Sequence, residues 1–460
     1  MSSAERSGPP APRDEPLVDL ATRVAGWARD GEQVEAFVAR GRDTEIRVFG
    51  GEVESLSSAT SAGIGVRVVS GQRQGFAYAG SLDPDVISET VAEARDNAGF
   101  ASPDEFVGLA APDGVAAADL DLWRDDLDGY PTADKVARAL DLEAAVRAGD
   151  PRIRQVESAE WGDAAFESAV VTSTGIVSFS RRTACYLSAY AIAGEGAETQ
   201  TGGGSTVGRS PTDLDAGKAV GDAVERATRL LGATQPASAH LTVVFEPRIT
   251  ATFLGILAGT LDGEAVSKGR SLFADRTGSA VSVAQLTLVD DPTDPEAYGA
   301  TPYDAEGLAT RRNRLIDDGV LQGFLYNTYS ARRAGTTSTA SAVRAGFKTV
   351  PGTGARALTV VPGDLDAEGV LAAVGDGLLV QSVSGLHSGV NPVSGDFSVG
   401  AEGVLIRNGQ LAGPVREITI ASTIQRMLAG IVAIGNDLER LPSSAAGVTL
   451  AIADVAMSGA

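Results

Sequence analysis

The spacing of apolar residues predicts a helix and then strands near the start of the chain. In VDLATRVAGWARDGEQ, the residues Leu20, Val24 and Trp27 recur at helical spacing, which predicts a helix that ends near Gly31. Three strand-like segments follow, VEAFVAR, TEIRVFGGEVESL and GIGVRVVSGQRQGFAYAG. Together these segments indicate an α+β arrangement.

Turn and cap residues divide these segments. Gly50-Gly51 and Ser70-Gly71 predict the turns of two hairpins, because such pairs accept the positive φ angles of tight hairpin turns. DPDVISETVAEARDNA predicts a further helix, with Asp83 as its N-cap and Pro84 at its first helical position.

The next part of the chain repeats this alternation. PTADKVARALDLEAAVRAG predicts a helix, AAFESAVVTSTGIVSFSRRTACYLSAYAIAGEG is strand-like, and DLDAGKAVGDAVERATRLLGA predicts another helix. Between the last two lies ETQTGGGSTVGRSP, which we interpret as a loop. Its Gly202-Gly203-Gly204 run lacks the Gly-Lys-Ser/Thr ending of a phosphate-binding loop, so a flexible turn is the preferred interpretation.

The pattern changes from LTVVFEPRITATFLGILAGTL onward, where short β-like runs alternate with Gly, Asp, Asn and Pro. Asn408-Gly409 between apolar runs predicts a hairpin. TIQRMLAGIVAIGNDLER predicts a helix, and GVTLAIADVAMSG a last strand.

The predicted fold class is therefore α+β, in two lobes. Residues 1–15, rich in Pro, Ser and charge, are expected to be a disordered tail. Residues 16–235 form a mixed α/β N-terminal lobe, which is divisible into 16–110 and 111–235. Residues 236–460 form a mostly antiparallel β C-terminal lobe.

Composition narrows the class of protein. The formal net charge of -22 argues against nucleic acid and anionic membranes as partners. No apolar run reaches the roughly 18 residues of a membrane span. The start of the chain lacks the apolar region of a signal peptide. Cys185 is the one cysteine, which fits a reducing compartment, and we expect it to be a buried thiol in a cytoplasmic protein.

Candidate metal ligands are sparse. The chain has two histidines, His240 and His387, far apart and outside any His-Glu pair, so a metal site made by this chain alone is not expected. Residues 290–306 gather six carboxylates in a loop rich in Pro and Gly, without the regular spacing of a calcium-binding EF-hand. A structural loop is the preferred interpretation, and a metal site is the alternative.

The segment GLHSGVNPVSGDFSVGAEG, residues 385–403, is dense in glycine and small polar residues. Glycine at this density has an entropic cost, which a tightly packed scaffold or a ligand can offset. Both interpretations stay open at this point.

Long blocks of the chain resemble the TldD/PmbA family. They include GEAVSKGRSLFADRTGSAV, the run from TLVDDPTDPEAYGATPYDAEG to YNTYSARRAGTTST, GVNPVSGDFSVGAEGVLIRNG and PVREITIASTIQRMLAGIVAIGNDLE. TEIRVFGGEVESLSSATSAGIGVRVVSGQRQGFAYAG is similar to the family's opening domain. The likeness spans nearly the whole chain and is closest to the PmbA (TldE) branch.

The resemblance implies a peptidase family whose TldD branch carries His-Glu-x-x-x-His for a catalytic metal. The corresponding segment here, residues 255–268, holds no histidine, and neither Asp262 nor Glu264 is assigned as a general base. We therefore assign no catalytic and no metal-binding residue. The resemblance implies instead a TldD-like partner subunit, or a second copy of this chain, with the divalent metal, expected to be zinc, in the TldD-like partner.

The expected function is that of the non-metal subunit of a cytosolic metallopeptidase complex that cleaves extended or modified peptides. The resemblance and the polar glycine-rich segment together suggest peptide contacts at His387, Ser388, Asn391, Ser394, Asp396 and Ser398. One alternative is a peptide-binding homodimer without activity. Another is a metal-independent hydrolase that uses Ser388, His387 and Asp396.

Overall fold

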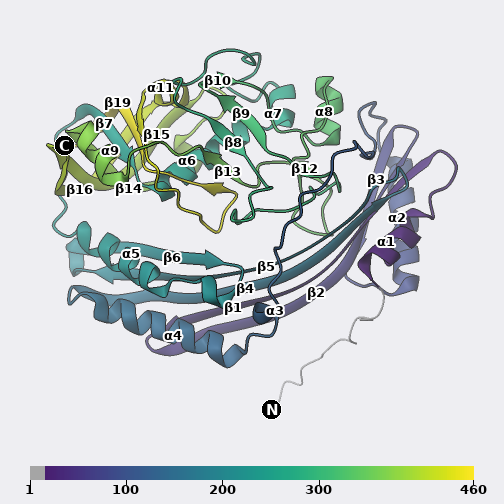
Figure 1. The fold of residues 1–460 in the computed structure, drawn as a ribbon, viewed down its shortest axis with the longest axis horizontal. Coiled ribbons are helices and arrows are strands. Elements are labelled where there is room, and N and C mark those ends of the chain that lie inside the picture. Colours follow the sequence, from purple (N-terminus) through teal and green to yellow (C-terminus); the bar gives the residue numbers. More distant parts are fainter. Residues whose placement is uncertain (1–15) are drawn as a thin grey trace.

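A long, curved antiparallel sheet forms the N-terminal lobe (Figure 1). The structure, a computed structural model, describes residues 16–460, so the tail predicted for residues 1–15 lies outside the described residues. The strand order is β3-β2-β1-β4-β5-β6. The strands are β1 (Glu32–Phe49), β2 (Glu52–Ser70), β3 (Arg73–Ala79), β4 (Ile153–Thr172), β5 (Val177–Ala193) and β6 (Gln200–Gly208).

The two predicted hairpin turns are present, but the strands are longer than predicted. Gly50 and Gly51 have φ angles of 65° and 81°, and Gly71 has 56°, as tight hairpin turns require. β1 is one strand that contains both VEAFVAR and TEIRVF, whereas the prediction separated these two runs at residues 41–43. The strand continues because Gly41 pairs with Phe166 of β4, whose ring covers it.

Helices pack on the two ends of this sheet. α1 (Leu17–Ala25) and α2 (Pro84–Phe100) cover one end, and α4 (Thr132–Gly149) and α5 (Ala216–Arg229) cover the other. The Asp83 carboxylate accepts the N–H of Asp85 at 2.9 Å, as predicted for the cap of α2. α1 ends before Gly26 rather than near Gly31, and Trp27 packs beside it on the same core. The remaining short helices of the lobe are α3 (Asp125–Asp128), η1 (Gly196–Glu198) and η2 (Pro211–Asp213).

The glycine run at residues 202–204 is a strand and not a turn. It lies in β6, where α5 packs directly on the backbone. A Cβ on Gly202 would lie 2.1 Å from the Ala227 nitrogen, and one on Gly204 would lie 1.9 Å from the Ala219 oxygen. These glycines therefore allow the close approach of helix and strand.

The C-terminal lobe contains two larger sheets, with α6 (Pro247–Thr260) against them, and the two-stranded sheet β11-β12. One larger sheet has the order β16-β15-β14-β7-β19-β17 and the other the order β10-β9-β8-β13-β18. Phe245, Phe253 and Phe397 make edge-to-face contacts in the shared core. Mixed content with a mostly β C-terminal lobe confirms the predicted fold class.

The remaining elements of this lobe are short, apart from the hairpin strands. The strands are β7 (Ala239–Phe245), β8 (Leu288–Asp290), β9 (Asn313–Asp317), β10 (Val320–Leu321), β11 (Ala342–Val343), β12 (Gly352–Thr353), β13 (Leu358–Val360), β14 (Gly377–Ser384), β15 (Asp396–Arg407), β16 (Gln410–Thr423), β17 (Ile431–Ile434), β18 (Ala445–Ala446) and β19 (Leu450–Ser458). The helices are α7 (Gly263–Ser267), α8 (Thr328–Ala334), α9 (Ala367–Val374), α10 (Leu386–Gly389) and α11 (Ile424–Ala429).

One helix in this lobe was not predicted, and one prediction was wrong. Residues 247–260 received no helix prediction, yet they form α6, because a continuous apolar run fits a buried helix as well as a strand. Residues 423–440 were predicted as one helix, but α11 ends at Ala429, and β17 then pairs with β19. The predicted hairpin at Asn408-Gly409 and the last strand, β19, are confirmed.

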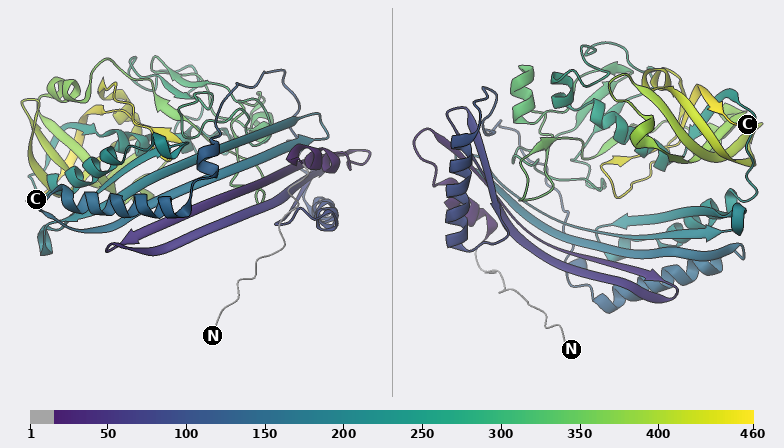
Figure 2. Two further views of the ribbon diagram at one scale, coloured as in Figure 1. Left: turned by 60° about the horizontal axis from the view of Figure 1, so that its bottom comes forward. Right: turned by 180° about the vertical axis from the view of Figure 1, so that it is seen from behind.

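A buried ion cluster joins the lobes where the C-terminal lobe lies over the concave face of the sheet (Figure 2). Glu35 of β1 accepts from Arg67 of β2 at 2.5 Å and from Arg344 of the C-terminal lobe at 2.6 Å. Arg67 also lies 3.6 Å from Glu306. The four side chains are at most 5% exposed. Burial would raise the pKa of Glu35, but the two arginines outweigh burial and lower it.

We expect Glu35→Gln to lower the free energy of unfolding by about 3–5 kcal/mol, because it leaves two buried guanidinium groups without their shared carboxylate. Urea denaturation measures this change. The control is Asp128→Asn, which removes the exposed pair of Asp128 with Arg42 and should cost about 0–1 kcal/mol. Equal costs for the two variants would contradict the assigned role of the cluster.

Candidate functional site

A groove of about 700 Å³ lies between the lobes. We call it the interlobe groove. Its walls are β6 of the N-terminal sheet, the first half of α6, the second half of β14 and the segment 441–445. The lining residues include Tyr190, Thr201, Gly203, Ser205, Arg226, Arg248, Thr252, Gly255, Gln381, Ser382, Leu386 and Glu402.

Two strand edges open into the interlobe groove. β6 is the last strand of the N-terminal sheet. β14 pairs with β7 only over residues 377–380, so residues 382–384 have a partner on one side alone, in β15. Free edges present backbone N–H and C=O groups that can pair with another extended chain. These two edges are the backbone groups of the groove that lack a neighbouring strand.

Arginines fix the floor of the groove. The carbonyl of Gly203 accepts from Arg226 at 2.8 Å and from Arg248 at 2.9 Å, so it turns toward the groove. Arg226 and Arg229 both pair with Glu246, which precedes α6. Burial and the nearby charge of Arg226 lower the pKa of Arg248. These contacts hold β6 against the start of α6.

The side chains around the groove do not fit a catalytic metal. Glu402 is the one carboxylate in its lining, and in residues 16–460 no three His, Cys, Asp or Glu side chains are grouped as a metal site requires. In the segment 255–268, Asp262 caps α7 by accepting the N–H of Glu264 at 2.8 Å, and Glu264 pairs with Lys268. Burial raises the pKa of Asp262.

The two histidines lie apart on the surface. His240 is 72% exposed, with its Nδ1 atom 3.2 Å from the carboxylate of Asp454. His387 lies on α10 and is exposed. Within the described residues its ring makes no hydrogen bond, while Ser388 donates to the Gly385 carbonyl and Asp396 accepts from Ser394. The arrangement that a metal-independent hydrolase would need is therefore not assembled.

The glycine-rich segment 385–403 lies at one end of the groove. Leu386 and Glu402 line the groove, whereas the six predicted peptide contacts are exposed beside it. The turn at residues 391–394 is stabilised by the Asn391 side chain, which accepts the N–H groups of Val393 and Ser394 at 2.9 and 3.2 Å. The assignment of the six residues to peptide binding stays a prediction.

Close packing accounts for several glycines of this segment. A Cβ on Gly389 would lie 2.0 Å from the Ser398 oxygen, and one on Gly403 would lie 2.0 Å from the Leu379 oxygen. Side chains at these positions would separate α10 and β14 from β15. The structural interpretation of the glycine density thus has direct support at these two positions.

The acidic loop 290–306 uses its buried carboxylates to bind backbone. Asp290 accepts the N–H groups of Arg356 and Ala357, at 2.9 and 2.7 Å. Asp304 accepts three, from Glu306, Leu308 and Ala342, at 2.9 to 3.1 Å. These bonds agree with the preferred interpretation as a structural loop. Cys185 is 1% exposed, as predicted, and burial raises its pKa to about 12.

Comparison with known proteins decides the family. Three family descriptions match in order along the chain: PmbA/TldA metallopeptidase domain 1 at residues 34–98, the central domain at 125–231 and the C-terminal domain at 238–459. Metalloprotease PmbA of Escherichia coli O157:H7 is 30% identical over 92% of both chains. The chain belongs to the PmbA/TldD family.

Other members of the PmbA/TldD family agree with this assignment. A metalloprotease PmbA homolog of Haemophilus influenzae is 28% identical over 92% of this chain and 90% of its own length. TldE from Thermococcus kodakarensis shares the fold, with a TM-score of 0.86 at 23% identity, over 96% of this chain and 99% of that one. The resemblance noted from the sequence is thus confirmed at the level of the family.

Sequence reasoning missed the lining of the interlobe groove. Arg248 and Thr252 lie on α6, a helix that was not predicted. Gln381 lies in β14, whose sequence contains no recognisable catalytic or binding motif. Glu246-Pro247 was the available signal, because proline is common at the first position of a helix.

We expect the pH dependence of stability to change in Asp304→Asn. Burial, together with the charge of Glu306, raises the pKa of Asp304 from 3.8 to about 7. Between about pH 4 and 7 the folded protein therefore binds a proton that the unfolded chain has lost. This group should lower the unfolding free energy by up to about 1.4 kcal/mol per pH unit as the pH rises through that window. Urea denaturation at pH 5, 6 and 7 should show a flatter dependence for the variant, and parallel curves would contradict it.

Proposed function

We propose that this chain is the subunit without the catalytic metal in a cytosolic PmbA/TldD-type peptidase complex. The observation that carries the proposal is the interlobe groove. It is bordered by two strand edges without a neighbouring strand, although Arg226 and Arg248 already bind the Gly203 carbonyl, and residues 16–460 place no set of metal-binding side chains there. The family and the name of its relative from E. coli support a peptidase context. The partner would be a TldD-like subunit, and the substrate an extended or modified peptide.

In this proposal the chain positions the peptide backbone. Backbone groups on β6 and on residues 382–384 of β14 pair with the backbone of the extended substrate, and such pairing tolerates varied side chains. The six polar residues of the glycine-rich segment would contact the peptide at the end of the groove. A divalent metal held by the partner subunit would supply Lewis-acid activation of the scissile carbonyl and of water.

The first test is recovery of the tagged chain from its own cells, with mass spectrometry of the proteins that accompany it. We expect a TldD-like protein bearing His-Glu-x-x-x-His, in about equal amount, and chelator-sensitive peptidase activity in the complex alone. Strong, chelator-insensitive activity of the isolated chain would overturn the proposal. Recovery of the chain with itself alone, with peptide affinity and no turnover, would favour the homodimer.

A second test addresses the edge of β6. Ser205 lies two residues from Gly203 on the same strand, so its N–H points to the same side as the Gly203 carbonyl, toward the groove. Ser205→Pro removes that N–H. We expect peptide turnover by the complex to fall about tenfold, because the substrate loses one hydrogen bond in a site that holds little water. Edge strands tolerate proline where the lost N–H has no partner in the sheet.

The control for this test is Ser205→Ala, which keeps the backbone N–H and should change turnover less than twofold. Urea midpoints of both variants establish that they fold. If the two variants lose turnover equally, the serine side chain and not the strand edge contributes to activity.

A further inference from the structure

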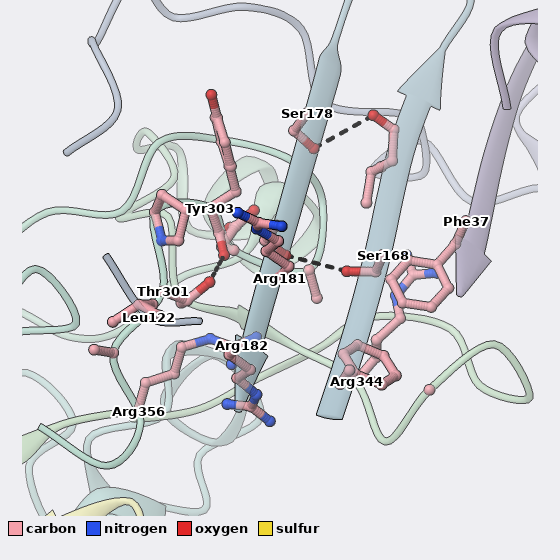
Figure 3. A pocket seen from close by; sticks show the side chains of 18 of the residues that line it. Phe37, Leu122, Ser168, Ser178, Arg181, Arg182, Thr301, Tyr303, Arg344 and Arg356 are labelled. Atoms are coloured by element: carbon pink, nitrogen blue, oxygen red, sulfur yellow. Dashed lines mark hydrogen bonds between the residues drawn. The ribbon is translucent and has the colours of Figure 1, made fainter. Parts of the chain in front are cut away.

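A second cavity, of about 300 Å³, lies between β4 and β5 and the loops of the C-terminal lobe (Figure 3). It shares no lining residue with the interlobe groove. Its distinguishing feature is charge, because Arg181, Arg182, Arg344 and Arg356 line it. We call it the arginine cavity.

Arg182 differs from its neighbour Arg181, which is exposed and lies over the ring of Trp123. Arg182 is partly buried on β5, and within residues 16–460 its guanidinium group has no hydrogen bond and no ion pair. Burial lowers its pKa, which records the cost of keeping this charge away from water. A partly buried cation without a counterion is unusual, because such charges are normally paired.

Arg356 adds a second charge at the same place. Figure 3 shows the guanidinium ends of Arg182 and Arg356 side by side, and burial together with the charge of Arg182 lowers the pKa of Arg356. Arg356 donates from Nη2 to the Ala342 carbonyl at 3.2 Å, but its buried Nε atom has no partner. Arg209, which bonds to backbone carbonyls, also lies close enough to Arg182 for their charges to repel.

The acids nearby are bonded to other groups. Within residues 16–460, Asp304 is the one carboxylate in the lining of the arginine cavity, and its oxygens accept three backbone N–H groups. Asp290, whose charge also acts on Arg356, accepts two backbone N–H groups and makes no ion pair with that guanidinium group. Glu35 is held by Arg67 and Arg344 in the ion cluster. The excess positive charge around Arg182 therefore has room for an anion.

The walls of the arginine cavity indicate which kind of anion. Phe37, Leu122 and Phe166 supply apolar surface on its sides. Such surface favours an organic body over a fully hydrated inorganic ion. Guanidinium groups match the planar fork of a carboxylate, with two parallel hydrogen bonds.

We propose that the arginine cavity binds a small organic carboxylate, with its head between Arg182 and Arg356 and its apolar body against the aromatic and aliphatic walls. The bound carboxylate supplies the counterion that these guanidinium groups lack. This proposal does not rest on the proposed function, because it concerns a separate cavity.

Isothermal titration calorimetry tests carboxylate binding in the arginine cavity, with the full chain at low salt and N-acetyl-L-leucine as the probe. We expect measurable binding of this acid, and at least about tenfold weaker binding of N-acetyl-L-leucinamide, which differs in lacking the charge. Arg182→Gln and Arg356→Gln should each weaken binding of the acid about 10- to 100-fold. Arg182→Lys, which keeps the charge without the fork, should retain intermediate affinity.

The matched control is Arg154→Gln, on β4 of the same sheet but outside the cavity, which should bind the acid as the unchanged chain does. Without ligand, Arg182→Gln should unfold at the same or a higher urea concentration, because it removes an unpaired charge. Equal binding of acid and amide, an affinity unchanged by Arg182→Gln, or no binding of the acid would overturn the proposal. Tighter binding of inorganic phosphate than of the acid would also overturn it, in favour of a phosphate site.

Discussion

The buried pairing of Glu35 with two arginines constrains the whole molecule. Burial removes the water that would solvate these charges, so the fold must place their ionic partners beside them. Arg67 comes from the same hairpin as Glu35, and Arg344 comes from the other lobe. A buried charge is tolerated when its partners are placed well. The relative position of the lobes is therefore defined by side-chain geometry over short distances, and the second carboxylate, Glu306, extends the same constraint to the acidic loop.

Both cavities follow from that placement. Segments 298–305 and 344–346 lie against β4 and β5 and leave the arginine cavity beneath them. Toward the other end of the sheet, β6 meets α6 and β14 across the interlobe groove. Arginines line both cavities, but they differ in their partners. The groove arginines are bonded to Glu246 and to the Gly203 carbonyl, whereas Arg182 in the arginine cavity has no such partner among residues 16–460.

Local signals in the sequence predicted local structure well. Asp83 followed by Pro84 marked the start of α2, and Asn408-Gly409 marked the turn between β15 and β16. Prediction failed for elements whose conformation depends on residues far away in the sequence. α11 ends and β17 begins because β19 offers a strand edge. β6 forms by pairing with β5, and its Gly202 and Gly204 allow α5 to pack directly on it.

The candidate site depends still more on distant contacts. Gln381 reaches the Arg226 carbonyl across 155 residues, a contact that no periodicity encodes. Arg182 occupies an ordinary position in an alternating strand, where most arginines would face water. The sequence identified the family and the absence of a histidine pair, whereas the lining of both cavities required the fold.

The separation along the chain between Glu35 and Arg344, 309 residues, has a consequence for synthesis. Arg67 lies 32 residues from Glu35 and can pair with it in the first hairpin. The nascent N-terminal sheet thus neutralises its buried acid long before Arg344 leaves the ribosome. Domains generally fold in order of emergence, and contacts of long range form late. The pair of Glu35 and Arg67 can therefore form before the C-terminal lobe is made, and Arg344 completes the cluster when that lobe docks.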